Sequence, residues 1–262
     1  MRTTLDFKIL PQPTETTCGP TCLHGVYKYF KSRITLPAII EDIPHLEDGG
    51  TLAVMLGRDA LKRGFKAKIY TYNVDMFDPT WFLESPDQLV HFLEAQKKAK
   101  RNKKLQFASD AYLEFLELGE EILFEDLTPK LLRRYLEKGV PILTGLSATY
   151  LYRSAREIGE TNEPNNVTGE PAGHFIVIAG IDRKRKTLLV ADPFHLNPFA
   201  TGNYYWVETH PVMSSILLGI LTYGANLLVI ERRSNDKGEP RVKRPTKKKT
   251  KKIKRAATKR SR

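Results

Sequence analysis

The sequence predicts an α+β domain in which an N-terminal helical half packs against a C-terminal antiparallel sheet. Helical periodicity prevails up to residue 138, whereas the segment 140–231 alternates or runs apolar with many β-branched residues. The two patterns follow one another along the chain instead of interleaving. Segregation of this kind is typical of a helical layer packed on a sheet, with a cleft between them.

The helical half contains three predicted segments. A first helix is expected over 18–30, with Pro20 in its first turn, where a missing N–H costs little. A second follows the turn Asp48-Gly49-Gly50, covers 51–63 and ends before a short strand over 65–70. The segment 85–138 is helical as well. Near its end Thr128 is an N-cap, Pro129 lies in a first turn and Gly139 follows the helix.

The stranded half contains five predicted strands, bounded by turn residues and rich in Val, Ile, Leu and Tyr. They cover residues 140–146, 174–181, 187–191, 204–207 and 226–231.

Charge is distributed unevenly along the chain. After Glu231 lie 16 of the 42 basic and 2 of the 30 acidic residues, which leaves residues 1–231 with a net charge of −2 against +12 for the whole chain. We expect one domain over 1–231 and a disordered Lys/Arg-rich tail over 232–262 that has almost nothing to bury. Such a tail would contact a polyanion weakly and without sequence preference, or remain solvated.

The chain has two cysteines, Cys18 and Cys22, within one predicted helix, which excludes a disulfide framework. No stretch approaches the length of a membrane span, and residues 1–11 lack the apolar run of a signal peptide. We therefore expect a cytoplasmic protein with reduced thiols. No cofactor motif is present, and a helix would spread Cys18, Cys22 and His24 over different faces, so that no metal site is expected. The sequence does not indicate an oligomeric state.

Cys18 lies where a loop becomes a helix. Unpaired N–H groups and the positive end of the helix dipole surround a side chain at this position, which favours a thiolate. Gly19 is expected to leave room for a substrate backbone, and the N–H of Cys18 can point at the oxygen of a carbonyl under attack. The alternative is a small buried apolar residue, which is our expectation for Cys22, one turn further into the helix.

A thiolate nucleophile requires a base, and His174 is the candidate among six histidines. It alone follows a run of small residues, Pro171-Ala172-Gly173, and begins a strongly apolar strand. The strand pattern leaves open whether this imidazole is functional or only makes a structural hydrogen bond.

Strand register places Asp192 beside His174. If strands 174–181 and 187–192 form a hairpin with residue 181 opposite 187, residue 176 lies opposite Asp192, and His174 is its diagonal neighbour on the same face. A shift of one residue would put the two side chains on opposite faces. In the predicted register Asp192 would hold the imidazole in the tautomer that leaves its other nitrogen for Cys18. The alternative is a turn residue before Pro193.

Gln12 lies in a Pro-rich loop, six residues before Cys18. Its side-chain amide is a hydrogen-bond donor, and at this spacing such a donor can complete an oxyanion hole.

Together these residues resemble the papain-like bacteriocin-processing (double-glycine leader) cysteine peptidase family. The similarity is carried by Gln12 and the run Cys18-Gly19-Pro20-Thr21-Cys22, by Gly173-His174-Phe175 and by Val190-Ala191-Asp192-Pro193. The resemblance implies a papain-like fold without a cofactor. It also implies roles for the four residues: oxyanion-hole donor for Gln12, nucleophile for Cys18, general base and acid for His174, and orienting group for Asp192.

The chain departs from the members of that family that cut double-glycine leaders. In those members the peptidase is usually one domain of a transporter. No membrane span or nucleotide-binding domain is expected here, so the chain resembles a free-standing bacterial branch of the family. It is also enlarged by a helical insertion over about 75–138. The aromatic residues of this insertion either form ordinary core or shape a substrate groove. They are Trp81, Phe82, Tyr112 and Phe115.

Three functions remain open at this stage. The first is hydrolysis of a peptide or isopeptide bond in a peptide or protein substrate, through an acyl-enzyme on Cys18. The second keeps the acyl-enzyme but transfers the acyl group to an amine. The third is a non-catalytic binding module whose basic tail contacts nucleic acid or acidic partners. The predicted Cys-His-Asp triad favours the first.

Overall fold

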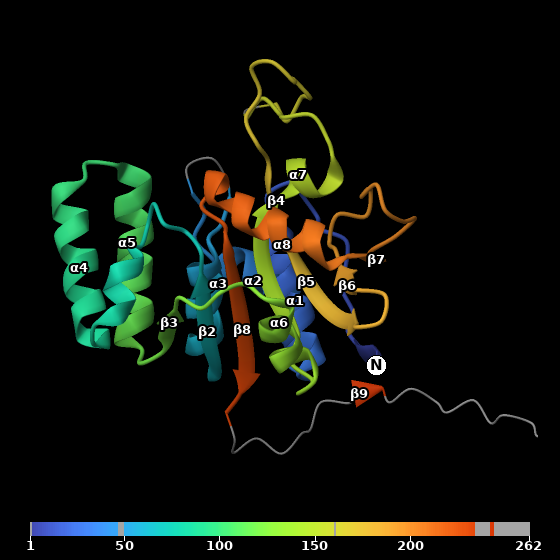
Figure 1. Ribbon diagram of the computed structural model, residues 1–262, viewed down its shortest axis with the longest axis horizontal. Coiled ribbons are helices and arrows are strands. Elements are labelled where there is room, and N and C mark those ends of the chain that lie inside the picture. Colours follow the sequence, from blue (N-terminus) through green and yellow to red (C-terminus); the bar gives the residue numbers. More distant parts are fainter. Residues whose placement is uncertain (1, 47–49, 160, 234–241, 244–262) are drawn as a thin grey trace, which may run out of the picture.

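The computed structural model describes residues 2–46, 50–159, 161–233 and 242–243 (Figure 1). Of the predicted tail, only 232–233 and 242–243 are among these residues, and of the predicted turn at 48–50 only Gly50 is. The last long strand ends at Arg232, one residue beyond the predicted domain boundary. Disorder of the tail and its contact with polyanions therefore stay predictions.

Helices are concentrated in the first half of the chain, as expected. No helix in the described ranges is long and apolar enough to cross a membrane. The helices are α1 (Cys18–Tyr29), α2 (Leu36–Asp42), α3 (Ala53–Lys62), α4 (Pro86–Ala99), α5 (Lys103–Glu117), α6 (Pro129–Leu136), α7 (Ala148–Tyr152) and α8 (Thr209–Leu218), with the 3₁₀ helices η1 (Pro79–Leu83) and η2 (Gly219–Thr222).

The five predicted strands of the second half are present, and four further strands join them. The strands are β1 (Arg2–Leu5), β2 (Phe65–Thr71), β3 (Glu121–Leu123), β4 (Ile142–Ser147), β5 (Gly173–Asp182), β6 (Thr187–Ala191), β7 (Tyr204–Glu208), β8 (Asn226–Arg232) and β9 (Val242–Lys243). Of these, β2 was expected from the first half, whereas β1, β3 and β9 were not.

All strands belong to one sheet, in the order β3-β2-β8-β4-β5-β1-β9, with β6 paired to β5 and β7 to β6. Neighbouring strands run antiparallel, apart from the parallel pair β2 and β3. Helices α1 and α3 cover one face of the sheet, whereas α6 and α8 lie on the other (Figure 1). The predicted α+β class is confirmed, although the sheet also takes strands from the helical half.

The inserted segment is not helical throughout. Helices α4 and α5 form a hairpin that stands beside the sheet (Figure 1), but β3 then joins the sheet edge next to β2, and α6 packs on a sheet face. Helix α6 begins as predicted, because the Thr128 hydroxyl accepts the N–H of Leu131 at 3.2 Å.

The aromatic residues of the insertion form core. Phe115 and Tyr112 are buried, and the Tyr112 ring lies edge-on to Phe77 with centroids 4.8 Å apart. Trp81 stacks on Phe92, and Phe82 on Phe124. None of the four predicted aromatic residues lines the active-site pocket described below. Of the two expectations for them, the structure therefore supports ordinary core.

The β5–β6 hairpin contains a bulge that decides the register at its far end. Next to the turn Asp182 lies opposite Thr187, one residue away from the predicted pairing. Ala179 is then left without a partner between Ile178 and Gly180, and beyond it Val177 lies opposite Ala191. This restores the predicted register up to the last residue of β6, Ala191, directly before Asp192. The prediction is thus wrong at the turn and right at the end that carries His174.

Candidate active site

Cys18 is the first residue of α1 and is half-buried, as the sequence predicts. Thr17 precedes it, but no side chain of the described residues caps the first turn. The Thr17 hydroxyl instead accepts the N–H of Thr14 at 3.0 Å and so closes the loop in front of the helix. The Cys18 sulfur therefore lies at the positive end of the helix dipole, beside first-turn N–H groups that no side chain engages.

His174 is the second residue of β5, and its ring is almost completely enclosed. The ring nitrogen Nε2 lies 2.8 Å from Oδ1 of Asp192. Burial by itself lowers the pKa of His174, but the charge and hydrogen bond of Asp192, with a further contribution from Cys18, outweigh burial and raise the pKa to about 10. At neutral pH the imidazolium is therefore the favoured form of this side chain.

Asp192 directly follows β6 and is fully buried. Besides His174, its Oδ1 accepts the N–H of Phe194 at 2.9 Å, whereas Oδ2 accepts the hydroxyls of Tyr152 at 2.6 Å and Tyr205 at 2.7 Å. Burial alone would raise the pKa of Asp192, yet the His174 charge and these hydrogen bonds lower it. The carboxylate is thus held as an anion without contact to water.

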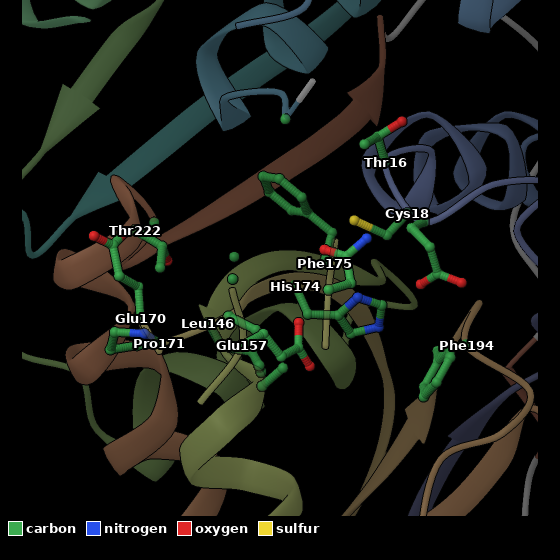
Figure 2. A pocket seen from close by; sticks show the side chains of 18 of the residues that line it. Thr16, Cys18, Leu146, Glu157, Glu170, Pro171, His174, Phe175, Phe194 and Thr222 are labelled. Carbon is green, nitrogen blue, oxygen red and sulfur yellow. The ribbon is translucent and has the colours of Figure 1, made fainter. Parts of the chain in front are cut away.

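Cys18 and His174 line the same pocket, which has a volume of about 930 Å³. Figure 2 shows the Cys18 sulfur and the His174 ring projecting into this hollow from α1 and from β5. Because Nε2 of His174 is engaged by Asp192, Nδ1 is the nitrogen left for the sulfur. The electrostatic contribution of Cys18 to the pKa of His174 is the sign that the two groups lie close together.

Gln12 lines this pocket as well. Its backbone N–H donates to the carbonyl of Pro193 at 2.9 Å, which ties the Gln12 loop to the segment after Asp192. Its side-chain Nε2 donates to the carbonyl of Thr14 at 3.0 Å. The same nitrogen makes a longer bond to the carbonyl of Glu15 at 3.4 Å, and this is the bond that a ligand in the pocket would have to replace.

The other charged groups of the pocket are mainly acidic. Glu15, Glu157 and Glu170 contribute carboxylates, and Lys104 contributes an ammonium group. Burial, followed by the nearby charge of Glu15, raises the pKa of Glu157. Acidic side chains therefore outnumber basic ones in the pocket that contains Cys18.

Cys22 is the buried counterpart that the sequence predicts. It is fully enclosed, and its thiol donates to the carbonyl of Phe175 at 3.2 Å. Burial, together with the charges of Cys18 and Asp192, raises the pKa of Cys22 well above its ordinary value. This thiol is therefore a packing element between α1 and β5.

The role expected of Gly19 needs correction, because this residue is buried and does not make room for a substrate. A Cβ at Gly19 would lie 2.5 Å from Cγ2 of Thr51 and 3.2 Å from the Phe175 ring. The glycine thus allows α1 to approach β5 and the segment before α3.

A Gly19→Ala substitution is accordingly expected to lower the free energy of unfolding by about 1–3 kcal/mol, because the added methyl group overpacks this contact. Urea denaturation would measure the change. Adding Thr51→Ser, which removes Cγ2, should restore part of the loss. Gly159→Ala is the matched control, since nothing lies within 4 Å of its Cβ position. Equal stability of the Gly19→Ala and Gly159→Ala proteins would contradict this account.

Two residues of the site are absent from the sequence-based prediction. Tyr205 lies in a predicted strand, and its register opposite Val190 brings it next to Asp192. Strand alternation alone could have suggested this neighbour. Tyr152 ends the five-residue helix α7, and no local pattern indicates that it reaches Asp192.

A helix that begins at a cysteine and packs on an antiparallel sheet bearing a His–Asp pair defines the class of the papain-like cysteine peptidases. This chain has that fold and that arrangement. Within the class, residues 108–213 match the model of the Peptidase_C39 like family. The match includes His174 and Asp192 but does not extend to Cys18 or Gln12. The segment is thus similar to the family that the motifs indicate.

Comparison with solved structures finds distant similarities. A double glycine motif protease from an AMS/PCAT transporter, in complex with the leader peptide, is 14% identical, with 89% of this chain and 99% of that chain covered and a TM-score of 0.43. The peptidase domain of Streptococcus ComA, a bifunctional ABC transporter of a quorum sensing pathway, is 14% identical, with coverages of 86% and 98% and a TM-score of 0.40. Xylellain, a cysteine protease from Xylella fastidiosa, is 12% identical, with coverages of 88% and 86% and a TM-score of 0.45. No curated protein matches the sequence.

Proposed function

We propose that this protein hydrolyses a peptide or isopeptide bond of a peptide or protein substrate through a Cys18-His174-Asp192 triad. The proposal rests on one observation. The His174 ring is hydrogen-bonded to a buried carboxylate on one side, and on the other side it lies beside Cys18 in a pocket. A nucleophile, a base and a group that orients the base are the minimum that acyl transfer to a thiol requires.

In this mechanism the Cys18 sulfur, as a thiolate paired with the His174 imidazolium, attacks the scissile carbonyl carbon. The N–H of Cys18 donates to the oxyanion that forms, and so does a side-chain N–H of Gln12, which gives up its long bond to the Glu15 carbonyl. His174 Nδ1 gives its proton to the leaving amine as the C–N bond breaks, which leaves a thioester on Cys18. His174 then takes a proton from water, and the resulting hydroxide releases the carboxylic acid and restores the thiolate.

The thiol chemistry can be tested without knowledge of the natural substrate. Iodoacetamide at pH 7 is expected to alkylate Cys18 faster than a free model thiol and to leave Cys22 unmodified, as measured by mass spectrometry of the digested protein. Cys22 is an internal control, because it shares the helix but is fully buried. A Cys18 rate no higher than that of the model thiol would contradict an activated nucleophile.

The reaction itself can be tested with a library of proteome-derived peptides. The wild type and a Cys22→Ala protein are expected to produce new peptide termini that a Cys18→Ala protein does not. An added amine would appear in the products if the acyl-enzyme were transferred instead of hydrolysed. Identical termini with and without Cys18 would refute the peptidase proposal.

A further inference from the structure

We infer that Tyr152 and Tyr205 are positioning residues, whose hydroxyls fix the Asp192 carboxylate, and through it the His174 ring, in the arrangement that the triad requires. The inference rests on the proposed function. Tyr152 also lines the pocket, but the hydroxyls of both residues bind Asp192 and act through it.

The two carboxylate oxygens of Asp192 have different hydrogen-bond partners. Oδ1 faces His174 Nε2 and the N–H of Phe194, whereas Oδ2 receives two tyrosine hydroxyls at 2.6 and 2.7 Å. Among the described residues, neither hydroxyl donates to any acceptor outside this group. A carboxylate that is fully removed from water is stable as an anion only if donors replace the lost solvent, and the tyrosines provide half of them.

Both tyrosines are held in place by the fold. Tyr205 lies on β7 opposite Val190 of β6, and its ring is 4.7 Å from that of Phe199. Tyr152 ends α7, and its ring faces those of His174 and Phe194 with centroids 6.0 and 6.2 Å away. These aromatic rings cover Asp192, so that water cannot easily replace a missing hydroxyl.

Removal of one hydroxyl should change the protonation of His174. With a single donor left on Oδ2, the Asp192 carboxylate can rotate away from His174, and a charge that is no longer held beside the ring stabilises the imidazolium less. The titratable groups that act on the His174–Asp192 pair are Cys18 and Cys22 of α1, and the two tyrosines themselves. A Tyr→Phe change keeps the ring that packs and leaves both cysteines in place, so that its effect reports the hydroxyl.

The experiment is an NMR titration of the intact protein with ¹³C-labelled histidine. In the Tyr152→Phe protein and in the Tyr205→Phe protein, the midpoint of the His174 titration is expected to fall by roughly one pH unit relative to the wild type. Tyr150→Phe is the matched control, because Tyr150 lies on the same helix and its hydroxyl makes no hydrogen bond to the described residues. Its titration should equal that of the wild type.

An Asp192→Asn background separates this inference from the proposed function. There, adding Tyr152→Phe or Tyr205→Phe should produce no further shift, since the anion that the hydroxyls stabilise is gone. Unchanged midpoints in both tyrosine variants, with a clear shift in Asp192→Asn, would overturn the positioning role alone. An unchanged midpoint in Asp192→Asn itself would overturn the orienting role of Asp192 in the triad. The two variants are independent, so that a folding defect in one leaves the other to decide.

Discussion

A His174→Ala protein is expected to hydrolyse peptides roughly 10⁵-fold more slowly than the wild type, measured as kcat/KM. The imidazole that is lost stabilises the Cys18 thiolate, protonates the leaving amine and activates the water. No other described side chain is placed to do this, because His24, the histidine nearest to Cys18 in sequence, is buried within α1 and its pKa is lowered, first of all by burial. The remaining rate should come from binding and the oxyanion hole.

Two controls separate lost catalysis from lost structure. Cys18→Ala should reduce kcat/KM by a similar factor, and the double variant should be little slower than either single one, because the triad acts as a unit. Added imidazole should partly rescue His174→Ala, since the substitution opens a ring-sized space between Asp192 and the pocket. A His174→Ala protein that retains more than about a tenth of the wild-type activity would exclude this residue as the base.

The second large effect concerns stability. The contribution of His174 to the free energy of unfolding is expected to fall by up to about 1.4 kcal/mol per pH unit as the pH rises above 6.5, and a Cys18→Ala background isolates it, because no thiolate there offsets the histidine proton. The pKa of His174 is about 10 in the folded chain, against 6.5 as its ordinary value. Between these values the folded chain holds a proton that the unfolded chain has released. The contribution of His174 is therefore complete below pH 6.5 and is lost as the pH approaches 10.

Asp192 has the opposite dependence. Its pKa is lowered in the folded chain from an ordinary value of 3.8, so that its contribution is present above that value and is lost as the pH falls through the folded-state pKa. The pair therefore stabilises the fold most between about pH 4 and 6.5.

Urea denaturation at a series of pH values would measure this dependence. Asp192→Asn is the comparison, because it removes the charge that holds the His174 proton. In the Asp192→Asn protein the free energy of unfolding should change less with pH between about 6.5 and 9. Parallel curves for the two proteins would show that the coupling of His174 to Asp192 contributes nothing measurable to folding.

Most of the site follows from local sequence signals. The start of α1 at Cys18 is marked by the loop-to-helix transition and by Pro20, and β5 by its apolar run after Gly173. The joint prediction of Gln12, Cys18, His174 and Asp192 also depends on the resemblance to a peptidase family. Gln12, Cys18 and His174 line one pocket, and Asp192 lies directly behind His174.

The rest depends on long-range packing that sequence periodicity does not report. Strands β1 and β3 have four and three residues, too few for a period to be recognised. Tyr152 reaches Asp192 only because α7 packs beside β4 and β5, which no local pattern encodes. The bulge at Ala179 did have a signal, because a glycine within a strand pattern often marks one, and Gly180 follows it.

That bulge has a consequence for how the sequence can vary. Between the bulge and His174 the side chains alternate between the two faces of β5. Removal of a single residue there would shift the preceding residues by one position relative to β6 and place Gly173 instead of His174 beside Asp192. Substitutions there should be tolerated much better than insertions or deletions of odd length. The loop at 183–186 lies beyond this segment and is free to change length. Related chains should therefore vary at the tip of the hairpin while they keep the count of residues from Gly173 to Ala179 unchanged.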